Sequence, residues 1–430
     1  MEKIVITGGK PLHGAIEISG MKNSAVAVIL ATVLIEDICV IENVPDISDV
    51  KICFDILTSM GIKVRLISAN TYEIDSRVAT GGKSPYDLVR KMRASYYLIG
   101  AELGRFGKAH VGLPGGCDFG VRPIDQHIKG FEALGATVTV EGGYVDAKTD
   151  GGVLGGHVYF DGVTVGGTMN VIMAAVRAEG QTVIENAARE PHIVDLANFL
   201  NACGAQISGA GTDVIKITGV KNLHGCTHAI IPDMIEAGTF MIAAAATKGA
   251  LHITNVIPKH LESVTAKLTE MGVCVEEEDD AVFVSNCSDT LSKINVKTQP
   301  YPGFPTDLNP QMCVLLCLSD GDCCLTEGVW DNRFRYVEEL KRMGASISVD
   351  GKTAVVEGNT LFSPARVRAV DLRAGAAMIL AALVADGTTE IEDVHHIQRG
   401  YDNIVEKLRL CGADIRLCEY KDIVDTSMAN

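Results

Sequence analysis

The segment Arg342-Met343-Gly344-Ala345-Ser346-Ile347 decides the fold, because segments like it recur along the whole chain. In each copy a helix ends at the glycine, which allows a left-handed turn, and a strand follows. The six glycines are separated by 74, 69, 68, 72 and 68 residues, and they are Gly61, Gly135, Gly204, Gly272, Gly344 and Gly412. Common open repeat arrays have units of roughly 20–50 residues. The longer spacing predicts six copies of a small α/β unit.

Two further signals precede most of these glycines. The first is an isoleucine followed two residues later by Asn or Asp, which predicts a short strand running into a turn. It occurs at Ile41–Val44, Ile184–Ala187, Ile253–Val256 and Ile391–Val394. The second is a helix rich in small apolar residues, which we expect to be buried because it is apolar nearly all round. These helices are expected to begin near Lys22, Arg93, Thr168, Glu236, Asp307 and Arg373.

The repeats predict an α/β protein with two lobes of three units each. We expect lobe 1 to span residues 22–231, and lobe 2 to combine residues 1–21 with residues 232–430. The N-terminal strand Lys3–Ile6 has no earlier unit of its own, so we expect it to complete lobe 2. Two-lobed proteins place their ligand in the cleft and can close around it.

Composition excludes several classes of protein. Of the 430 residues, 47% are hydrophobic and 21% are charged, which is typical of a soluble globular protein. A net charge of −16 argues against nucleic acid as a partner. The longest apolar runs, Ala25–Ile35 and Ala374–Ala385, are shorter than the ~20 residues of a membrane span. Thirteen cysteines without a CxxC pair, and no signal peptide at Met1, predict a reducing cytoplasm.

Three of the six expected helix starts carry a cation, namely Lys22, Arg93 and Arg373. The other three start with Thr, Glu or Asp, which ordinary capping explains because acceptors and anions suit a helix N-terminus. A cation at that position costs ~0.3–1 kcal/mol. The three cations therefore indicate either a bound anion or solvated charges.

The second unit contains an exceptional loop, Gly112–Asp125, where the other copies have a short turn. The loop holds four glycines and two prolines, with Cys117 near its middle and Arg122 five residues later. A nearby cation lowers the pKa of a thiol from its usual ~8.5 and makes it more reactive. The loop is thus either a lid with a reactive cysteine or a long surface turn.

Several motifs together carry a family resemblance over nearly the whole chain. They are Ile18–Asn23, Met92–Ser95, Leu113–Cys117, Arg122–Asp125, Glu185–Pro191, Phe304–Asp307, Asn332–Phe334, Asp371–Ala374 and Arg399–Tyr401. With these motifs the chain resembles the UDP-N-acetylglucosamine 1-carboxyvinyltransferases, which are enolpyruvyl transferases. The resemblance implies the two-lobed inside-out α/β barrel of EPSP synthase, with six βαβαββ units around buried helices.

The resemblance also implies an activity. These enzymes transfer the enolpyruvyl group of phosphoenolpyruvate to the 3′-hydroxyl of UDP-N-acetylglucosamine and release phosphate by addition and elimination. This is the first committed step of peptidoglycan synthesis, in the cytoplasm. The implied partners are these two small molecules, without a membrane or nucleic acid, and no cofactor or metal is implied.

The resemblance assigns site residues by position. The implied catalytic residues are Lys22, Cys117, Asp307 and Arg399, with Asp307 taking the hydroxyl proton. Cys117 acts as a general acid or aids product release, and it matches the cysteine that fosfomycin alkylates. The implied phosphoenolpyruvate-binding residues are Lys22, Asn23, Arg122, Arg333, Arg373 and Arg399. Those for UDP-N-acetylglucosamine are Asn23, Arg93, Arg122, Pro123, Ile124, Asp125, Gln126, Thr164, Val165, Gly166, Asp307 and Val329.

Two alternatives stay open. The first is the related enolpyruvyl transferase that acts on shikimate 3-phosphate, although that family has no cysteine matching the Leu113–Cys117 loop. The second is a non-catalytic relative that uses the same scaffold for binding. The loss of Lys22, Asp307 or Arg399 would favour this second alternative, and all three are present.

Overall fold

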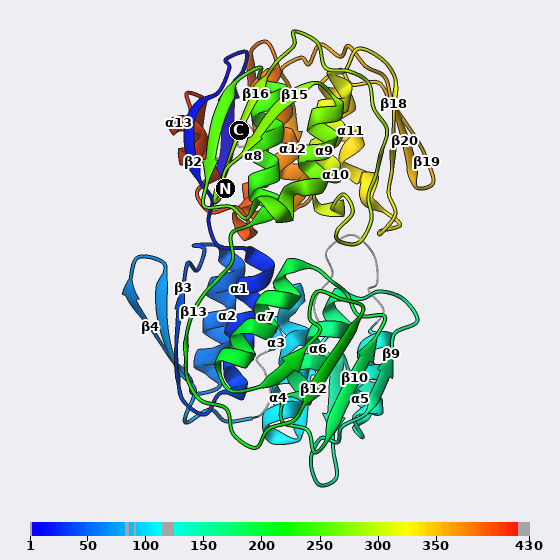
Figure 1. The fold of residues 1–430 in the computed structure, drawn as a ribbon. Coiled ribbons are helices and arrows are strands. Elements are labelled where there is room, and N and C mark those ends of the chain that lie inside the picture. The colour runs from blue at the N-terminus through cyan, green and yellow to red at the C-terminus, as the bar shows by residue number, and fades with distance from the viewer. Residues whose placement is uncertain (1, 82–85, 90–91, 114–123, 420–430) are drawn as a thin grey trace, which may run out of the picture. The chain divides into compact units, whose positions relative to one another are not determined.

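The computed structural model describes residues 2–81, 86–89, 92–113 and 124–419 (Figure 1). The chain divides into two compact units. Unit 1 comprises Met1–Ile18, Ile235–Gln299 and Phe304–Asn430, and unit 2 comprises Ser19–Met234 and Pro300–Gly303. The chain therefore crosses between the units more than once, and each unit contains segments that are distant in sequence.

Unit 1 contains three four-stranded sheets. Their strand orders are β21 (Arg366–Arg368)-β22 (Thr388–Glu392)-β1 (Glu2–Thr7)-β23 (Asp414–Glu419), β15 (Val273–Glu277)-β16 (Ala281–Asn286)-β14 (Ala250–Thr254)-β2 (His13–Glu17), and β17 (Val296–Lys297)-β18 (Cys323–Thr326)-β20 (Thr353–Val356)-β19 (Ile347–Asp350). The helices are α8 (Met234–Ala246), η3 (Pro258–Leu261), α9 (Glu262–Glu270), η4 (Thr306–Leu308), α10 (Asn309–Cys317), η5 (Arg333–Tyr336), α11 (Val337–Arg342), α12 (Leu372–Val384), η6 (Val394–Arg399) and α13 (Ile404–Leu410).

Unit 2 contains two four-stranded sheets and one of three described strands. The orders are β13 (Thr227–Ala229)-β3 (Ile38–Glu42)-β5 (Thr71–Asp75)-β4 (Lys63–Ser68), β11 (Gln206–Ser208)-β12 (Val214–Thr218)-β10 (Gln181–Glu185)-β9 (His157–Tyr159), and β6 (Lys108–Gly112)-β8 (Tyr144–Lys148)-β7 (Thr137–Glu141). The helices are α1 (Lys22–Ala31), η1 (Thr32–Leu34), α2 (Ser48–Ser59), α3 (Tyr86–Val89), η2 (Arg93–Tyr96), α4 (Tyr97–Phe106), α5 (Asp125–Ala133), α6 (Val165–Ala175) and α7 (Pro191–Ala202).

The four-stranded sheets share one pairing pattern. One edge pair is parallel and the other two pairs are antiparallel, as in β9/β10, β10/β12 and β12/β11. In chain order this sheet and its helices read β9-α6-β10-α7-β11-β12, which is the predicted βαβαββ unit. The N-terminal strand β1 pairs with both β22 and β23, so it joins a sheet formed by the C-terminal part of the chain, as expected for a strand that completes lobe 2.

The predicted turns are confirmed by their backbone angles. All six repeat glycines have positive φ, between 82° at Gly61 and 96° at Gly204 and Gly344. The turn residues Asn43, Asn186, Asn255 and Asp393 also have positive φ, between 54° and 59°. Asn and Asp tolerate this left-handed conformation better than other residues with a side chain. Four of the six repeats thus use both local turn signals, the glycine and the Asn or Asp, to arrange their strands and helices.

The predicted buried helices are present, and their starts differ slightly from expectation. In α1 every residue from Ser24 to Ala31 is buried, and in α12 every residue from Arg373 to Leu383 is buried. Helix α6 begins at Val165 rather than near Thr168, because the Thr164 hydroxyl accepts a hydrogen bond from the Gly167 N–H at 3.2 Å and caps the helix earlier. Helix α8 begins at Met234, two residues before Glu236.

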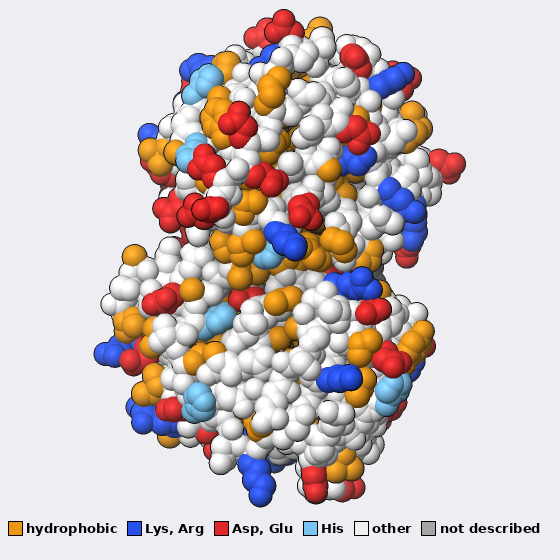
Figure 2. Space-filling model, in the orientation of Figure 1, with side chains coloured by type: hydrophobic (Ala, Val, Ile, Leu, Met, Phe, Trp, Pro, Cys, Tyr) orange, Lys and Arg blue, Asp and Glu red, His pale blue; other side chains and the backbone are white. Residues whose placement is uncertain are grey.

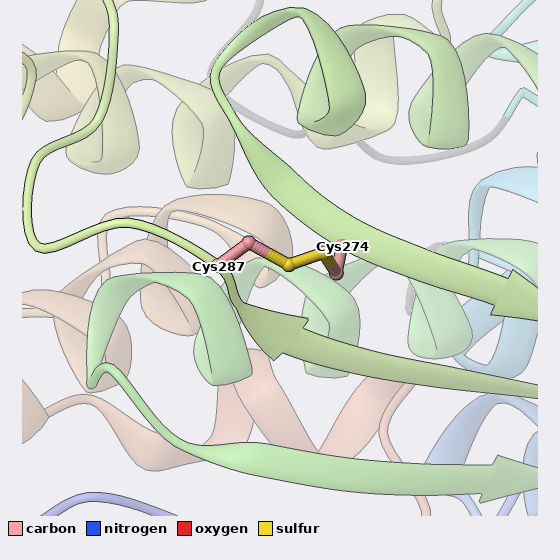
Figure 3. The surroundings of a disulfide bond; sticks show 2 residues. All are labelled: Cys274 and Cys287. Carbon is pink, nitrogen blue, oxygen red and sulfur yellow. A yellow bond between two sulfur atoms is a disulfide. The ribbon is translucent and has the colours of Figure 1, made fainter.

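Two pairs of cysteines have different environments. Cys313 and Cys317 are completely buried in α10, as the apolar character of that helix predicts. Cys274 in β15 and Cys287, directly after β16, are paired as a disulfide with a Cα–Cα distance of 5.7 Å (Figure 3). Nothing in the cysteine spacing predicts this pair, since the register of β15 against β16 brings the two residues together.

No helix in the described part of the chain combines the length and the apolar character that crossing a membrane requires.

Candidate active site

The most highly organised group of predicted site residues in unit 1 surrounds Asp307. Its Oδ2 accepts hydrogen bonds from Arg373 Nη2 at 3.0 Å and Nε at 3.2 Å, and its Oδ1 accepts one from Arg333 Nη2 at 3.2 Å. Both arginine side chains are about 5% exposed, whereas the Asp307 side chain is 30% exposed. Paired guanidinium groups therefore orient a carboxylate that solvent can still reach.

A buried glutamate holds the backbone around Asp307. Glu327 is only 1% exposed, and its Oε2 accepts hydrogen bonds from Thr306 Oγ1 at 3.0 Å and Asn309 Nδ2 at 2.9 Å. Its Oε1 accepts one from the Val329 N–H at 2.9 Å. Glu327 thereby connects η4 and the start of α10 to the segment that carries Val329. Sequence reasoning missed this residue, because a lone Glu after a strand carries no pattern of its own.

Arg373 occupies the first turn of α12, next to its cap. The Asp371 carboxylate accepts hydrogen bonds from the N–H groups of Arg373 and Ala374 at 2.8 and 2.9 Å. The Arg373 guanidinium lies 5.4 Å from the centre of the Tyr401 ring, within the range of a cation–π contact. The Tyr401 hydroxyl bonds in turn with Gln311 and Thr239. A network of buried polar side chains therefore lies next to Arg373.

Arg399 ends η6, where it is half-buried. The rings of the neighbouring His395 and His396 have centroids 4.1 Å apart. Burial lowers the pKa of His396, and the nearby His395 and Arg399 lower it further. A neutral His396 adds no further positive charge beside Arg399.

In unit 2, Lys22 opens α1 and forms a buried ion pair. Its Nζ lies 2.8 Å from Asp49 Oδ2, with the lysine side chain 14% and the aspartate side chain 3% exposed. The backbone N–H of Lys22 donates to Asp233 Oδ2 at 3.3 Å, and Asn23 follows in the same turn. Lys22 and Arg373 thus both have carboxylate partners, so their place at a helix start does not by itself require a bound anion.

The N-terminal ends of α5 and α6 lie side by side and carry several predicted nucleotide-binding residues. Gln126 Oε1 accepts a hydrogen bond from the Asp161 N–H at 3.0 Å, and Gln126 Nε2 donates to the Asp161 carboxylate at 3.2 Å and to Asp125 at 2.9 Å. This ties the residues Ile124–Gln126 to the loop before Thr164, Val165 and Gly166. The two predicted segments are therefore close neighbours in the fold.

His127 joins these two helices, and sequence reasoning missed it. A Cβ on Gly166 would lie 2.9 Å from His127 Cε1 and 3.0 Å from the Tyr96 hydroxyl, so only glycine fits there without a shift. Asn170 Oδ1 accepts from the Gly100 N–H, which turns Asn170 Nδ2 toward His127 Nδ1 at 2.9 Å. Burial lowers the pKa of His127 to about 4, so the ring is neutral at pH 7.

Four predicted residues have little or no description. Arg93 begins η2, but its side chain lies outside the described part of the structure. Cys117, Arg122 and Pro123 fall within residues 114–123, which are also outside it. Among the residues that are described, no group of three or more His, Cys, Asp and Glu side chains could hold a metal ion.

Comparisons with known proteins match almost the whole chain. The family model for EPSP synthase (3-phosphoshikimate 1-carboxyvinyltransferase) matches residues 6–408. The UDP-N-acetylglucosamine 1-carboxyvinyltransferase of Clostridium botulinum is 56% identical over 416 residues, covering 96% of this chain and 99% of that protein. The UDP-N-acetylglucosamine 1-carboxyvinyltransferase 2 of Clostridium acetobutylicum is 54% identical over 97% of this chain and 99% of its own.

Solved structures are similar over the same extent. The crystal structure of the enolpyruvyl transferase NikO from Streptomyces tendae has a TM-score of 0.88 at 27% identity, covering 98% of this chain and 99% of that one. The EPSP synthase of Acinetobacter baumannii has a TM-score of 0.76 at 18% identity, covering 97% and 100%. At that identity the second likeness concerns the fold alone.

Proposed function

Because the chain belongs to the EPSP synthase family of enolpyruvyl transferases, we propose that it transfers the enolpyruvyl group of phosphoenolpyruvate to the 3′-hydroxyl of UDP-N-acetylglucosamine. The observation that carries this choice of acceptor is the 56% identity to a UDP-N-acetylglucosamine 1-carboxyvinyltransferase over 96% of the chain. The predicted fold, that of EPSP synthase, agrees with its structural neighbours. The reaction is the first committed step of peptidoglycan synthesis, in the cytoplasm.

Phosphoenolpyruvate carries a phosphate and a carboxylate, so its binding requires several cations. Lys22, Arg122 and Arg399 bind these anions, with Asn23 as a neutral donor, and Arg333 and Arg373 add positive charge. Guanidinium groups suit both anions because they can donate two parallel hydrogen bonds to either. The nearly complete burial of Arg333 and Arg373 supports this role, because a buried cation interacts more strongly with an anion than an exposed one does.

Asp307 takes the proton of the attacking hydroxyl. The 3′-hydroxyl oxygen forms a bond to C2 of phosphoenolpyruvate while C3 gains a proton, which gives a tetrahedral adduct. The adduct then loses phosphate as the C2–O bond breaks and C3 releases a proton, which restores the double bond. The 30% exposure of the Asp307 carboxylate and its orientation by two arginines support a general base that a substrate can approach.

Cys117 acts at C3 as a general acid or assists the release of product. Both roles place the thiol near the enolpyruvyl group, where an alkylating inhibitor such as fosfomycin would reach it. We expect fosfomycin to inactivate the purified protein by alkylating it, and intact-mass measurement should show no adduct on Cys117→Ser. Full activity after long incubation with excess drug would contradict the placement of this thiol.

The nucleotide part of the acceptor binds at the N-terminal ends of α5 and α6. Arg93, Arg122, Pro123, Ile124, Asp125, Gln126, Thr164, Val165 and Gly166 contact the uridine and diphosphate, while Asn23, Asp307 and Val329 contact the sugar. Helix N-termini suit a diphosphate because their N–H groups point outward and the helix dipole favours negative charge. The hydrogen bonds between Gln126 and Asp161 support this proposal, since they hold both segments together.

The test measures inorganic phosphate release with phosphoenolpyruvate and either UDP-N-acetylglucosamine or shikimate 3-phosphate. We expect release with the sugar nucleotide only, and its loss in Cys117→Ala. The exposed Cys324→Ala is the matched control and should retain full activity. Release with shikimate 3-phosphate alone would overturn the acceptor, and a folded sample inactive with both would favour a non-catalytic relative.

A further inference from the structure

A basic pocket of about 590 Å³ lies in unit 2, away from the residues assigned to the substrates. It is lined by five cations, Arg105, Lys108, Lys148, Arg177 and Lys221, and by no described Asp or Glu. Arg177 follows the C-terminal end of α6, whereas Thr164–Gly166 lie at its N-terminal end. Eleven helical residues separate these ends by roughly 16 Å. The pocket is therefore distinct from the proposed nucleotide site.

The two arginines have structural partners that explain part of this charge. Arg105 Nη1 donates to the carbonyls of Val33 and Ser76 at 2.7 and 2.8 Å. Arg177 Nη1 pairs with Glu36 Oε1 at 2.6 Å, and its Nη2 donates to the Lys221 carbonyl at 3.2 Å. Both arginines lie at helix C-termini, where the dipole favours cations. These contacts hold both guanidinium groups in the lining of the pocket.

The lysines have no such explanation. Lys108 in β6 and Lys148 in β8 are direct cross-strand partners, so both side chains lie on one face of the sheet. Like charges at directly opposite positions destabilise a sheet. No ion pair joins Lys108, Lys148 or Lys221 to any described residue. In a chain with a net charge of −16, such a local excess of positive charge stands out. On the face shown in Figure 2, Lys and Arg side chains are mostly scattered among other residues.

The lining of the pocket is open at two glycines. Gly151 and Gly152 both have positive φ, and a Cβ added to either would meet no atom within 4 Å. The Phe106 ring, which the Arg105 guanidinium covers at 5.2 Å, supplies an apolar part of the wall. The volume is within the range of roughly 300–1,000 Å³ that is usual for small-molecule sites.

We propose that this pocket binds a small anion with linked phosphate groups, such as a polyphosphate or a nucleoside triphosphate. Such a ligand carries several negative charges, which balance the Lys108/Lys148 pair together with Lys221. A singly charged anion would leave most of this repulsion in place. The site gives the protein a second anion-binding function, which does not depend on the transferase reaction.

The test is calorimetric titration of the full chain with inorganic tripolyphosphate at low ionic strength, where charge interactions are least screened. Lys108→Gln/Lys148→Gln should weaken the Kd at least tenfold. The control, Lys63→Gln/Lys216→Gln, removes two exposed charges from other strands of unit 2 and should change the Kd less than twofold. Equal weakening in both variants, or no binding to the wild type, would overturn the proposal.

A second measurement separates ligand binding from an effect on folding. Without ligand, Lys148→Glu should raise Tm slightly because it replaces repulsion with attraction, and tripolyphosphate should no longer raise Tm further. Titration with a nucleoside triphosphate then identifies the source. If the nucleoside triphosphate binds more tightly than tripolyphosphate, the protein also contacts its nucleobase or ribose. If it binds more weakly, the pocket prefers an inorganic ligand. A lower Tm for ligand-free Lys148→Glu would contradict the proposed repulsion.

Discussion

Helices α1 and α12 begin with the same unusual feature, a cation in the first turn, yet the two cations have different surroundings. Lys22 of α1 pairs with Asp49, a carboxylate that is only 3% exposed. Arg373 of α12 pairs with Asp307, which is 30% exposed and shared with Arg333. Asp371 caps α12, whereas Met21 provides no side-chain cap for α1.

The difference is consistent with the proposed roles, in which Asp49 is a structural counterion and Asp307 is the general base. Asp49 is enclosed, so its principal effect is to neutralise Lys22 inside the protein. Asp307 is held in place by two guanidinium groups but remains accessible, which is what a general base requires. Removal of Asp49 should therefore affect mainly stability, and removal of Asp307 should affect mainly the chemical step.

The largest effect is expected for Asp307→Asn. The amide retains the shape of the side chain but cannot take a proton, so kcat for phosphate release should fall about 10²–10⁴-fold. Circular dichroism should show an intact fold. Asp350→Asn, an exposed change in β19 of the same unit, is the control and should leave kcat unchanged. A kcat within threefold of the wild type would rule out Asp307 as the base.

Asp49→Asn should destabilise unit 2 by about 3 kcal/mol, because it leaves the mostly buried Lys22 ammonium without its counterion. Chemical denaturation measures this loss. The double variant Asp49→Asn/Lys22→Met should recover part of the stability, since it buries no charge. If the double variant is no more stable than Asp49→Asn, the ion pair is not the cause.

His127 extends the comparison to a buried base, in which burial lowers the pKa more than the nearby Asp125 carboxylate raises it. Its pKa of about 4 lies below the usual 6.5, so the unfolded state binds a proton first as the pH falls. The contribution of His127 to the free energy of unfolding is complete above pH 6.5 and is lost as the pH falls from 6.5 to 4. The free energy of unfolding lost over this range is about 3 kcal/mol, at 1.36 kcal/mol per pKa unit. His127→Gln should flatten this part of the unfolding free-energy profile, and an unchanged slope would contradict the assignment.

The smallest effect concerns the helix cap. Asp371→Ala removes the acceptor for the first N–H groups of α12 and should cost about 1 kcal/mol in thermal unfolding. Asp371→Asn keeps an acceptor and should cost less. Equal losses in the two variants would indicate that the charge of Asp371, rather than its capping hydrogen bonds, stabilises the start of α12.

The sequence predicted the repeating parts of the fold with good accuracy. Gly61 and Asn43 illustrate why, since a positive φ depends on a residue and its immediate neighbours. The start of α6 was placed three residues late because Thr164 and Thr168 are both plausible caps, and only the hydrogen bond from Gly167 distinguishes them. Local signals therefore predict elements well and predict their ends less well.

The candidate site was predicted less completely. Family resemblance indicated Asp307, Arg333 and Arg373, and the structure brings all three together. The sequence did not indicate Glu327, Asp49 or His127, because the partner that each side chain contacts is distant in sequence. The roles of Cys117, Arg122 and Pro123 stay predictions, since these residues lie outside the described part of the chain.

By itself, the sequence determined that six similar α/β units surround buried helices, because hydrophobic periodicity and turn residues act over a few positions. Only the tertiary structure decided which charges meet. Asp49 pairs with Lys22, and Asp307 pairs with Arg373, which is 66 residues away in sequence. Lys108 lies directly opposite Lys148 on the neighbouring strand. Such pairings depend on the register of strands and the packing of helices. Residues far apart in sequence come together only when the whole unit has folded.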